Sequence, residues 1–308
     1  MTRVLVIAGP TAVGKTEVAI GVARRLGGEI ISCDSMQLYR YMDIGSAKPS
    51  AAELAQVPHH MIGVIDPRDR FSAARYRELA EVAVADVVSR GKLPVICGGT
   101  GLYLDALLYG LDFAVAPESD PAYRESLYAF AEEQVAEALY ARLSALDPAA
   151  AARIHPHNVK RVIRALEAAE RERPLADFAG VREKKPVYDA VLVGLSRERE
   201  ELYDRINRRV DLLLAAGLFE EVQALMAMGL DESDISMKGI GYKEVIACLK
   251  GEYGPERAAE LIKRNTRHYA KRQMTWFKRY ADMKWFDLTG RNDLDRVAEE
   301  IAAWLPNA

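Results

Sequence analysis

The pattern of hydrophobic residues predicts that the chain begins with alternating strands and helices. Val4 to Ala8 is a short, continuous apolar run, as expected for a buried parallel strand, and Glu17 to Leu26 follows a helical period. Glu29 to Cys33 predicts a second strand, and His60 to Ile65 is a candidate for a third. The first two elements form a strand, a loop and a helix in immediate succession.

A longer helix and another buried strand follow. Ser72 is a candidate N-cap for a helix that runs to Arg90 and ends at Gly91. Pro94 to Cys97 predicts a buried strand, which leads into a Gly-Gly-Thr-Gly turn containing Thr100. Strands that alternate with helices imply an α/β fold with a doubly wound parallel sheet.

The pattern then changes to successive helices, which predicts an insertion. Pro121 to Leu146 and Asn158 to Arg171 have a helical period, with no convincing strand between them. Strand character returns from Tyr188 to Leu195, and further helices follow. We therefore expect a core that is discontinuous in sequence, residues 1–115 and 187–308, and a helical insertion, residues 116–186.

Composition adds limits on class and location. The 308 residues are half hydrophobic and 28% charged, which is typical of a globular protein. The first strand begins almost at Met1, and no apolar run approaches the roughly 20 residues of a membrane span, so we expect a cytosolic protein without a signal peptide. The cysteines lack paired spacing, which predicts buried thiols rather than disulfides or a zinc site: Cys33, Cys97 and Cys248.

The charge is distributed unevenly along the chain. A net charge of −3 and a pI near 6.1 give no general indication of nucleic acid. Residues 257–284, however, are locally basic and aromatic, with Lys263, Arg264, Arg267, Lys271, Arg272, Lys278 and Arg279 interleaved with His268, Tyr269, Trp276, Phe277 and Tyr280.

The glycine-rich loop after the first strand carries the strongest chemical signal. It matches G-x-x-x-x-G-K-[ST] and opens a helix, so its amides can surround a phosphate, with Lys15 reaching the outer oxygens and Thr16 available to Mg²⁺. This predicts a P-loop NTPase-like fold, although a nucleotide and another diphosphate would suit the same amides. The loop consists of Gly9, Pro10, Thr11, Ala12, Val13, Gly14, Lys15 and Thr16.

Residues that directly follow parallel strands are the next candidates, because ligands bind beyond the carboxyl ends of such strands. Asp34 follows the second predicted strand and could be a general base, a metal-water ligand or a helix cap. Thr100 could contact substrate or cap the helix after it. No apolar strand ends in the aspartate typical of an ATPase unless Asp34 takes that role, which weakens a motor-ATPase interpretation.

Two small basic clusters have alternative interpretations. Arg205, Arg208 and Arg209 lie on a predicted helix that begins near Glu198. They could form a solvated face, or one of them could neutralise a diphosphate leaving group. Lys160, Arg161 and Arg164 share one helix face and are either surface groups or contacts to a polyanion.

A series of motifs is more specific than any single residue. GPTAVGKT, SCDSMQLYRYMDIGSAKP, PHHMIGVIDP, GGTGLYLDAL, RIHPHNVKRVIRALE, DRINRRVD, KGIGYKE and YAKRQMTWF occur in this order between Gly9 and Phe277. Together they resemble the bacterial tRNA dimethylallyltransferases, also called tRNA isopentenyltransferases. The resemblance covers nearly the whole chain.

The resemblance implies transfer of a dimethylallyl group from dimethylallyl diphosphate to the N6 amine of adenosine at tRNA position 37. The glycine-rich loop would hold diphosphate rather than ATP, and Mg²⁺ would be the cofactor. Asp34 would accept the amine proton or orient the amine, Thr100 would contact the target nucleotide, and Arg209 would be associated with the diphosphate.

The resemblance also implies a set of tRNA contacts. The partners would be the anticodon stem-loop of tRNA and dimethylallyl diphosphate, with no membrane, and we expect a monomer. A base in a folded anticodon loop must be unstacked and drawn into a pocket. The helical insertion and the basic stretch are suited to holding the loop while this happens. The implied contacts are Asp34, Ser35, Met36, Gln37, Thr100, Arg124, Lys160, Arg161, Val162, Ile163, Arg164, Lys238, Gly239, Ile240, Gly241, Tyr242 and Lys243.

Two other functions remain as alternatives. A small-molecule or nucleoside kinase shares the phosphate loop and a nearby aspartate, but it leaves the basic C-terminal stretch unexplained. An RNA-binding module that uses the loop only as an anion site gives Asp34 no task.

Overall fold

The computed structural model describes residues 1–111, 121–133, 136–170 and 186–305. They belong to two compact units, one made of Met1–Gly110 with Lys185–Ala308 and the other of Leu111–Lys184. The predicted domain boundary between residues 115 and 116 and the predicted helix end at Arg171 lie outside the described residues. Within the described part of the chain, no helix is both long and apolar enough to cross a membrane.

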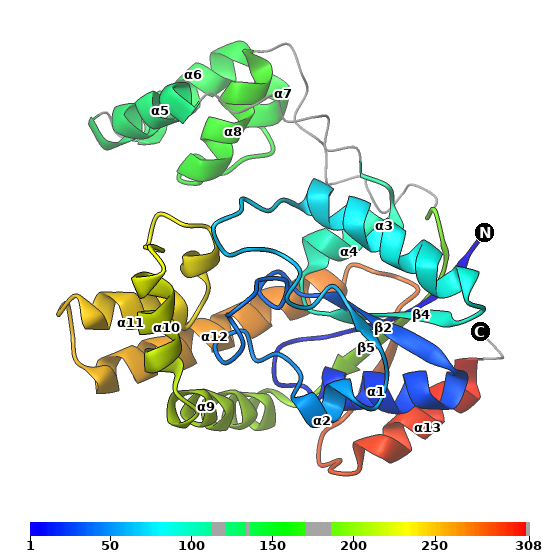
Figure 1. The fold of residues 1–308 in the computed structure, drawn as a ribbon. Coiled ribbons are helices and arrows are strands. Elements are labelled where there is room, and N and C mark those ends of the chain that lie inside the picture. Colours follow the sequence, from blue (N-terminus) through cyan, green and yellow to red (C-terminus); the bar gives the residue numbers. More distant parts are fainter. Residues whose placement is uncertain (112–120, 134–135, 171–185, 306–308) are drawn as a thin grey trace. The chain divides into compact units, whose positions relative to one another are not determined.

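The first unit is built on a parallel sheet, as the sequence predicts (Figure 1). The strand order is β3-β2-β4-β1-β5-β6, and every neighbouring pair is parallel. The central strand β1 is buried from Val4 to Ala8, because it has a neighbour on each side and helices on both faces. The strands are β1 Arg3–Ala8, β2 Gly28–Cys33, β3 His59–His60, β4 Leu93–Gly98, β5 Asp189–Ser196 and β6 Lys284–Asp287.

Helices cover both faces of this sheet, with α3 and α4 on one side and α1 and α13 on the other (Figure 1). Ser72 caps α3 by accepting a hydrogen bond from the Arg75 N–H, as predicted. The helices of this unit are α1 Lys15–Leu26, α2 Ala51–Leu54, α3 Ala73–Ser89, α4 Gly101–Leu108, α9 Arg199–Ala215, α10 Leu218–Ala227, α11 Tyr242–Leu249, α12 Pro255–Phe277 and α13 Leu294–Trp304, with a 3₁₀ turn at Ser236–Lys238.

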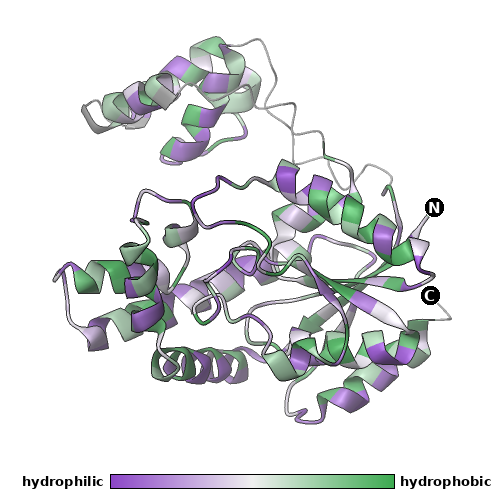
Figure 2. Ribbon diagram, viewed as in Figure 1, coloured by the Kyte–Doolittle hydropathy of each residue, from purple (hydrophilic) through white to green (hydrophobic). Residues whose placement is uncertain are grey.

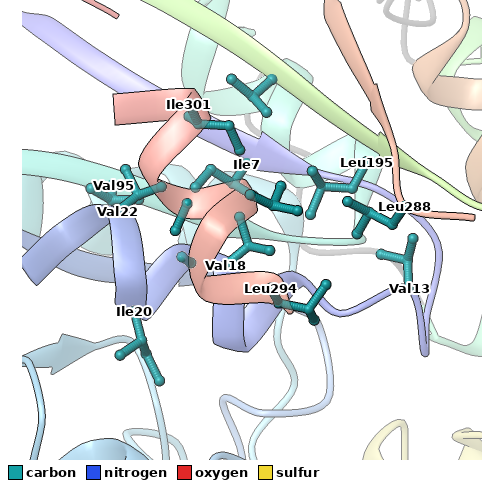
Figure 3. Packing of buried hydrophobic residues seen from close by; sticks show 14 of the residues in the cluster. Ile7, Val13, Val18, Ile20, Val22, Val95, Leu195, Leu288, Leu294 and Ile301 are labelled. Carbon is teal, nitrogen blue, oxygen red and sulfur yellow. The ribbon is translucent and has the colours of Figure 1, made fainter. Parts of the chain in front are cut away.

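The main core lies between the sheet and the pair α1 and α13. Ile7 and Leu195 of the sheet, Val18 of α1 and Leu294 and Ile301 of α13 belong to one buried cluster (Figure 3). Both helices combine hydrophobic and hydrophilic residues (Figure 2), as expected for helices that bury one side. This packing fixes the phosphate loop, because the loop joins β1 to α1.

Three features differ from the sequence prediction. The third strand is only His59–His60, because Met61 and Gly63 have positive φ angles of 64° and 60° and turn the chain away. Strand β6 and helix α13 have no counterpart in the prediction, although α13 completes the core. Of the three cysteines, Cys33 is buried as predicted, whereas Cys97 and Cys248 are only partly buried; all are free thiols.

The second unit has its own small core. Leu139, Leu143, Val162, Ile163 and Leu166 are among the residues buried in it. Its described residues form helices and no strand. The helices are α5 Pro121–Glu133, α6 Ala136–Leu146, α7 Pro148–Ala151 and α8 Val159–Ala169.

Candidate active site

The phosphate loop follows β1 and is held by three cationic side chains that donate to its carbonyl oxygens. Lys15 Nζ lies 2.8 Å from Pro10 O. Arg205 Nε lies 2.9 Å from Ala12 O, and Arg197 Nε, which is buried, lies 3.0 Å from Val13 O. These contacts fix a loop that includes three positive φ angles, at Gly9, Ala12 and Gly14.

A cavity of about 490 Å³ opens beside this loop within the first unit. Residues from the turn after β2, from α9 and α12 and from the segment before α11 converge on it. Its polar lining includes Thr11, Lys15, Thr16, Asp34, Ser35, Gln37, Arg209, Lys238, Lys243, Thr266, Tyr269, Arg272 and Gln273, and its apolar lining includes Phe71, Ile206, Val210, Leu213, Leu218, Ile235 and Ile262. The mixture suits a ligand with one anionic end and one apolar end.

Asp34 lies at the carboxyl end of β2 and lines the cavity. Its Oδ1 accepts hydrogen bonds from Met36 N at 2.8 Å and Gln37 N at 3.4 Å, so one oxygen caps the local turn. The described residues contain no group of three or more His, Cys, Asp or Glu that could hold a metal ion. Asp34 is therefore not part of a preformed metal cluster there, and its carboxylate lies in the same cavity as Lys15.

The electrostatics of the cavity centre on Lys15. Burial lowers the pKa of Lys15 to about 8, while Cys97 and Asp34 oppose this shift and Arg209 adds to it. Burial likewise lowers the pKa of Arg209, with Asp34 opposing. Two partly buried cations and one carboxylate thus face the same space, which gives it a positive bias suited to an anion.

Thr100 occupies the N-cap position of α4, but its side chain makes no capping hydrogen bond. Instead its Oγ1 accepts from the Ser35 N–H at 3.0 Å, and Thr100 N donates to Cys33 O at 3.1 Å. Thr100 is absent from the described residues that line the cavity, so it supports the turn that carries Asp34.

The three arginines of α9 that form the predicted basic cluster, Arg205, Arg208 and Arg209, have different environments. Arg209 lines the cavity, and its Nη2 donates to Ala47 O at 3.3 Å. Arg205 holds the phosphate loop, as described above. Arg208 is exposed on the other side of the helix, with its Nη2 4.0 Å from Asp204. The predicted solvated face therefore applies to Arg208 alone.

Gln273 is a site residue that the sequence analysis missed. Its Oε1 accepts from Thr11 N at 2.9 Å, and its Nε2 donates to Gly99 O at 2.9 Å, so α12 ties the phosphate loop to the turn after β4. Its side chain is buried on the same helix face as Ala270 and Phe277. An amide at a buried position of a helical pattern was the signal that could have identified it.

The basic, aromatic stretch maps mostly onto α12, and several of its aromatic residues are structural. Phe277 and Tyr280 are buried, and the Tyr280 hydroxyl donates to Asp105. The ring of Trp276 lies against Gly101, where a Cβ would come within 2.2 Å of it. Phe277 and Tyr280 therefore do not provide a surface for RNA as the sequence suggested, and Trp276 is partly buried.

The residues expected to contact tRNA divide between the two units. In the first unit, two of these residues do not line the cavity. Thr100 supports the turn that carries Asp34, as described above, and Tyr242 is fully buried, with its hydroxyl donating to Glu221. The others at the cavity wall are Ser35, Met36, Gln37, Lys238, Gly239, Ile240, Gly241 and Lys243.

In the second unit, residues 160–164, which were expected to contact tRNA, lie on helix α8 and include both exposed and buried positions. Lys160, Arg161 and Arg164 are exposed. Val162 and Ile163 are 0% and 1% exposed in the core of this unit, so their side chains cannot reach RNA while it is folded, and the expectation is corrected for these two. Arg124 is paired with Glu167 through two hydrogen bonds of 2.9 and 2.8 Å.

Comparison with known proteins gives a consistent result. Residues 37–280 match the family described as IPP transferase, and residues 2–69 match the one described as isopentenyl transferase. The chain is 47% identical to the tRNA dimethylallyltransferase of Alkaliphilus oremlandii over 300 residues, which cover 97% of this chain and 96% of that protein. It is also 47% identical to the tRNA dimethylallyltransferase of Geobacillus kaustophilus over 304 residues, covering 98% and 96%.

Solved structures agree with the sequence relatives. The crystal structure of a tRNA isopentenylpyrophosphate transferase from Bacillus halodurans has a TM-score of 0.75 and 43% identity, covering 100% of this chain and 96% of that one. A eukaryotic dimethylallyltransferase acting on tRNA has a TM-score of 0.80 and 27% identity, covering 100% and 79%.

Proposed function

The chain belongs to the tRNA dimethylallyltransferase family, and we propose that the cavity beside its phosphate loop is where this enzyme transfers the dimethylallyl group to tRNA. The donor is dimethylallyl diphosphate, the acceptor is N6 of adenosine 37 next to the anticodon, and the products are N6-isopentenyladenosine and diphosphate. The observation that carries the proposal is that the phosphate loop, Asp34 and Arg209 all face one cavity.

The donor half of the site consists of the phosphate loop and two cations. Residues 9–16 bind the diphosphate through backbone amides and the N-terminus of α1, while Lys15 and Arg209 neutralise the charge that develops as it leaves. With its pKa near 8, Lys15 remains mostly protonated at neutral pH. The apolar lining that includes Ile206, Val210 and Ile262 accommodates the dimethylallyl chain.

The lining of the cavity also fits a magnesium ion bound with the diphosphate. Thr16 directly follows Lys15 and lines the cavity, so its hydroxyl would be the protein ligand. Mg²⁺ takes much of its coordination from phosphate oxygens and water, which agrees with the lack of a preformed carboxylate cluster in the described residues. The ion would supply charge stabilisation for the diphosphate leaving group.

The acceptor half centres on Asp34. The N6 nitrogen forms a bond to the allylic carbon, the bond from that carbon to the diphosphate oxygen breaks, and its electron pair leaves with the diphosphate. Asp34 accepts the amine proton or aligns the amine for attack. Thr100 supports this step because it holds Ser35, the next residue, through its Oγ1.

Recognition of tRNA involves both units. In the first unit, the cavity wall formed by residues 35–37 and 238–241, together with Lys243, contacts the nucleotide drawn out of the anticodon loop. In the second unit, Arg124 and the exposed Lys160, Arg161 and Arg164 contact the RNA backbone. A cytosolic monomer remains our prediction.

The test is transfer of label from dimethylallyl diphosphate to unmodified tRNA with Mg²⁺ and without ATP. We expect label on the wild-type tRNA and none when adenosine 37 is replaced. Absence of label together with ATP consumption by small acceptors would instead favour the kinase alternative.

The role of Asp34 is tested by the single-turnover rate of Asp34→Asn across pH. Loss of a general base should lower the rate by about 10²–10⁴-fold and remove the dependence on a carboxylate pKa. A parental rate in both Asp34→Asn and Asp34→Ala would contradict any catalytic role of Asp34.

A further inference from the structure

Glu221, in the first turn of α10, holds a neighbouring loop by its backbone. Its Oε2 accepts hydrogen bonds from the N–H groups of Asp43 and Ile44, both at 2.7 Å. Its Oε1 accepts from the N–H of Gly45 at 2.9 Å and from the hydroxyl of Tyr242 at 2.8 Å. Glu221 is not among the described residues that line the cavity, so nothing in the proposed reaction accounts for this arrangement.

The loop that Glu221 holds, residues 43–47, also contacts Arg209. Ala47 O accepts from Arg209 Nη2 at 3.3 Å and from Gln37 Nε2 at 3.3 Å. Within the loop, Ala47 N donates to Ile44 O at 2.8 Å, so the end bound by Glu221 and the end bound by Arg209 form one tight turn. A shift at the first end therefore moves the carbonyl at the second.

The surroundings of this loop restrict its movement. The ring of Tyr242 lies against Gly45, where an added Cβ would come within 2.5 Å of it. Helices α9 and α10 are joined by only Ala216 and Gly217, so the arginine and the carboxylate that hold the loop come from consecutive helices. The loop is thus fixed at both ends by one helical hairpin.

We propose that Glu221 is a positioning residue that sets the guanidinium of Arg209 for diphosphate by fixing the Ala47 carbonyl. The inference rests on the proposed role of Arg209. A carboxylate is required because two oxygens without protons must accept three N–H groups and one O–H group. An amide at this position would keep one acceptor and direct an N–H₂ group against backbone N–H donors.

The experiment measures inhibition of the full-length enzyme by inorganic diphosphate, competing with dimethylallyl diphosphate. Glu221→Gln should raise the inhibition constant about tenfold, because Arg209 is no longer held in place. Glu220→Gln is the matched control, since it removes the same charge from the same helical turn at an exposed position, and it should leave the constant unchanged. Tyr242→Phe, which removes one of the bonds to Glu221 and keeps the three amides, should give a smaller rise.

A double-mutant cycle separates positioning from a general loss of structure. Arg209→Ala should weaken diphosphate binding by itself, and adding Glu221→Gln to it should cause no further loss, because the residue being positioned is gone. Independent, multiplicative losses, or an unchanged constant in Glu221→Gln, would overturn the role of Glu221 and leave that of Arg209 intact. A parental constant in Arg209→Ala would instead refute the proposed diphosphate site at Arg209.

Discussion

Shortening Gln273 should weaken the fold and the phosphate loop together. Its amide links Thr11 N to Gly99 O with two hydrogen bonds of 2.9 Å, and the residue is only 4% exposed. The backbone N–H can only donate and the carbonyl can only accept, so these partners fix which way the amide points. Both contacts join segments that are far apart in sequence.

The expected magnitude follows from what Gln273→Ala leaves behind. An unpaired buried polar group costs about 1–3 kcal/mol. Thr11 borders the cavity, so water can replace its lost bond, whereas Gly99 O loses a partner in the interior. With about 1 kcal/mol for the apolar part of the side chain, we expect the free energy of unfolding to fall by about 3 kcal/mol.

Gln273→Glu separates the structural effect from the electrostatic one. The carboxylate can still accept from Thr11 N, but it cannot donate to Gly99 O, and it adds a negative charge next to the phosphate loop. A unit charge about 10 Å away costs about 1–2 kcal/mol at an effective dielectric constant near 20. Diphosphate should therefore bind the glutamate variant more weakly than the alanine variant.

The assays are urea unfolding and inhibition by inorganic diphosphate. Gly99→Ala provides a matched perturbation, because its Cβ would lie 2.1 Å from Gln273 Nε2 and would displace the amide. The two substitutions should be non-additive when combined. A loss below about 0.5 kcal/mol in Gln273→Ala, a value typical of a surface substitution, or equal diphosphate affinity in the alanine and glutamate variants, would refute this reasoning.

Three further predictions concern pH and backbone conformation. Burial lowers the pKa of Lys15 to about 8, so its charged form is lost as pH rises through 8 and the affinity for diphosphate should fall. The Lys15→Arg variant should not show this fall, because its guanidinium stays charged. Inhibition constants for diphosphate measured across this pH range would check the prediction. Hydrogen bonds from Arg90 lower the pKa of Glu29 to about 2, so the pair stabilises the fold above the ordinary glutamate pKa, and this stability is lost as pH falls through about 2. In urea unfolding at neutral pH, Arg90→Met should be less stable than the wild type, although by less than for a fully buried pair because Arg90 is 42% exposed. The stability of the variant should also depend less on acid. Tyr41 is 54% exposed and has a φ of 65°. Tyr41→Gly should therefore raise the midpoint of thermal unfolding, because glycine relieves about 1 kcal/mol of backbone strain. An unchanged or lower midpoint would contradict this prediction.

The sequence by itself determined the features that depend on residues close to one another along the chain. The phosphate loop could be identified because its strand, glycines, Lys15 and helix follow one another directly in the sequence. The residues of the motif are therefore also the residues that form the loop. The placement of Asp34 and Thr100 after β2 and β4 also followed, since the alternating pattern locates the carboxyl ends of parallel strands. The order of motifs indicated the family, which the relatives confirm.

Only the tertiary structure decided which side chains meet across long separations. Gln273 lies 262 residues from Thr11, and Glu221 lies 176 residues from Gly45, so no local pattern could pair them. Arg205, Arg208 and Arg209 looked equivalent in sequence, yet packing places Arg209 at the cavity wall and leaves Arg208 exposed. Strand β6 and helix α13 were missed because their hydrophobic patterns are short. Strand β6 pairs with β5 and α13 packs against α1, and these contacts cannot be predicted from the short patterns alone.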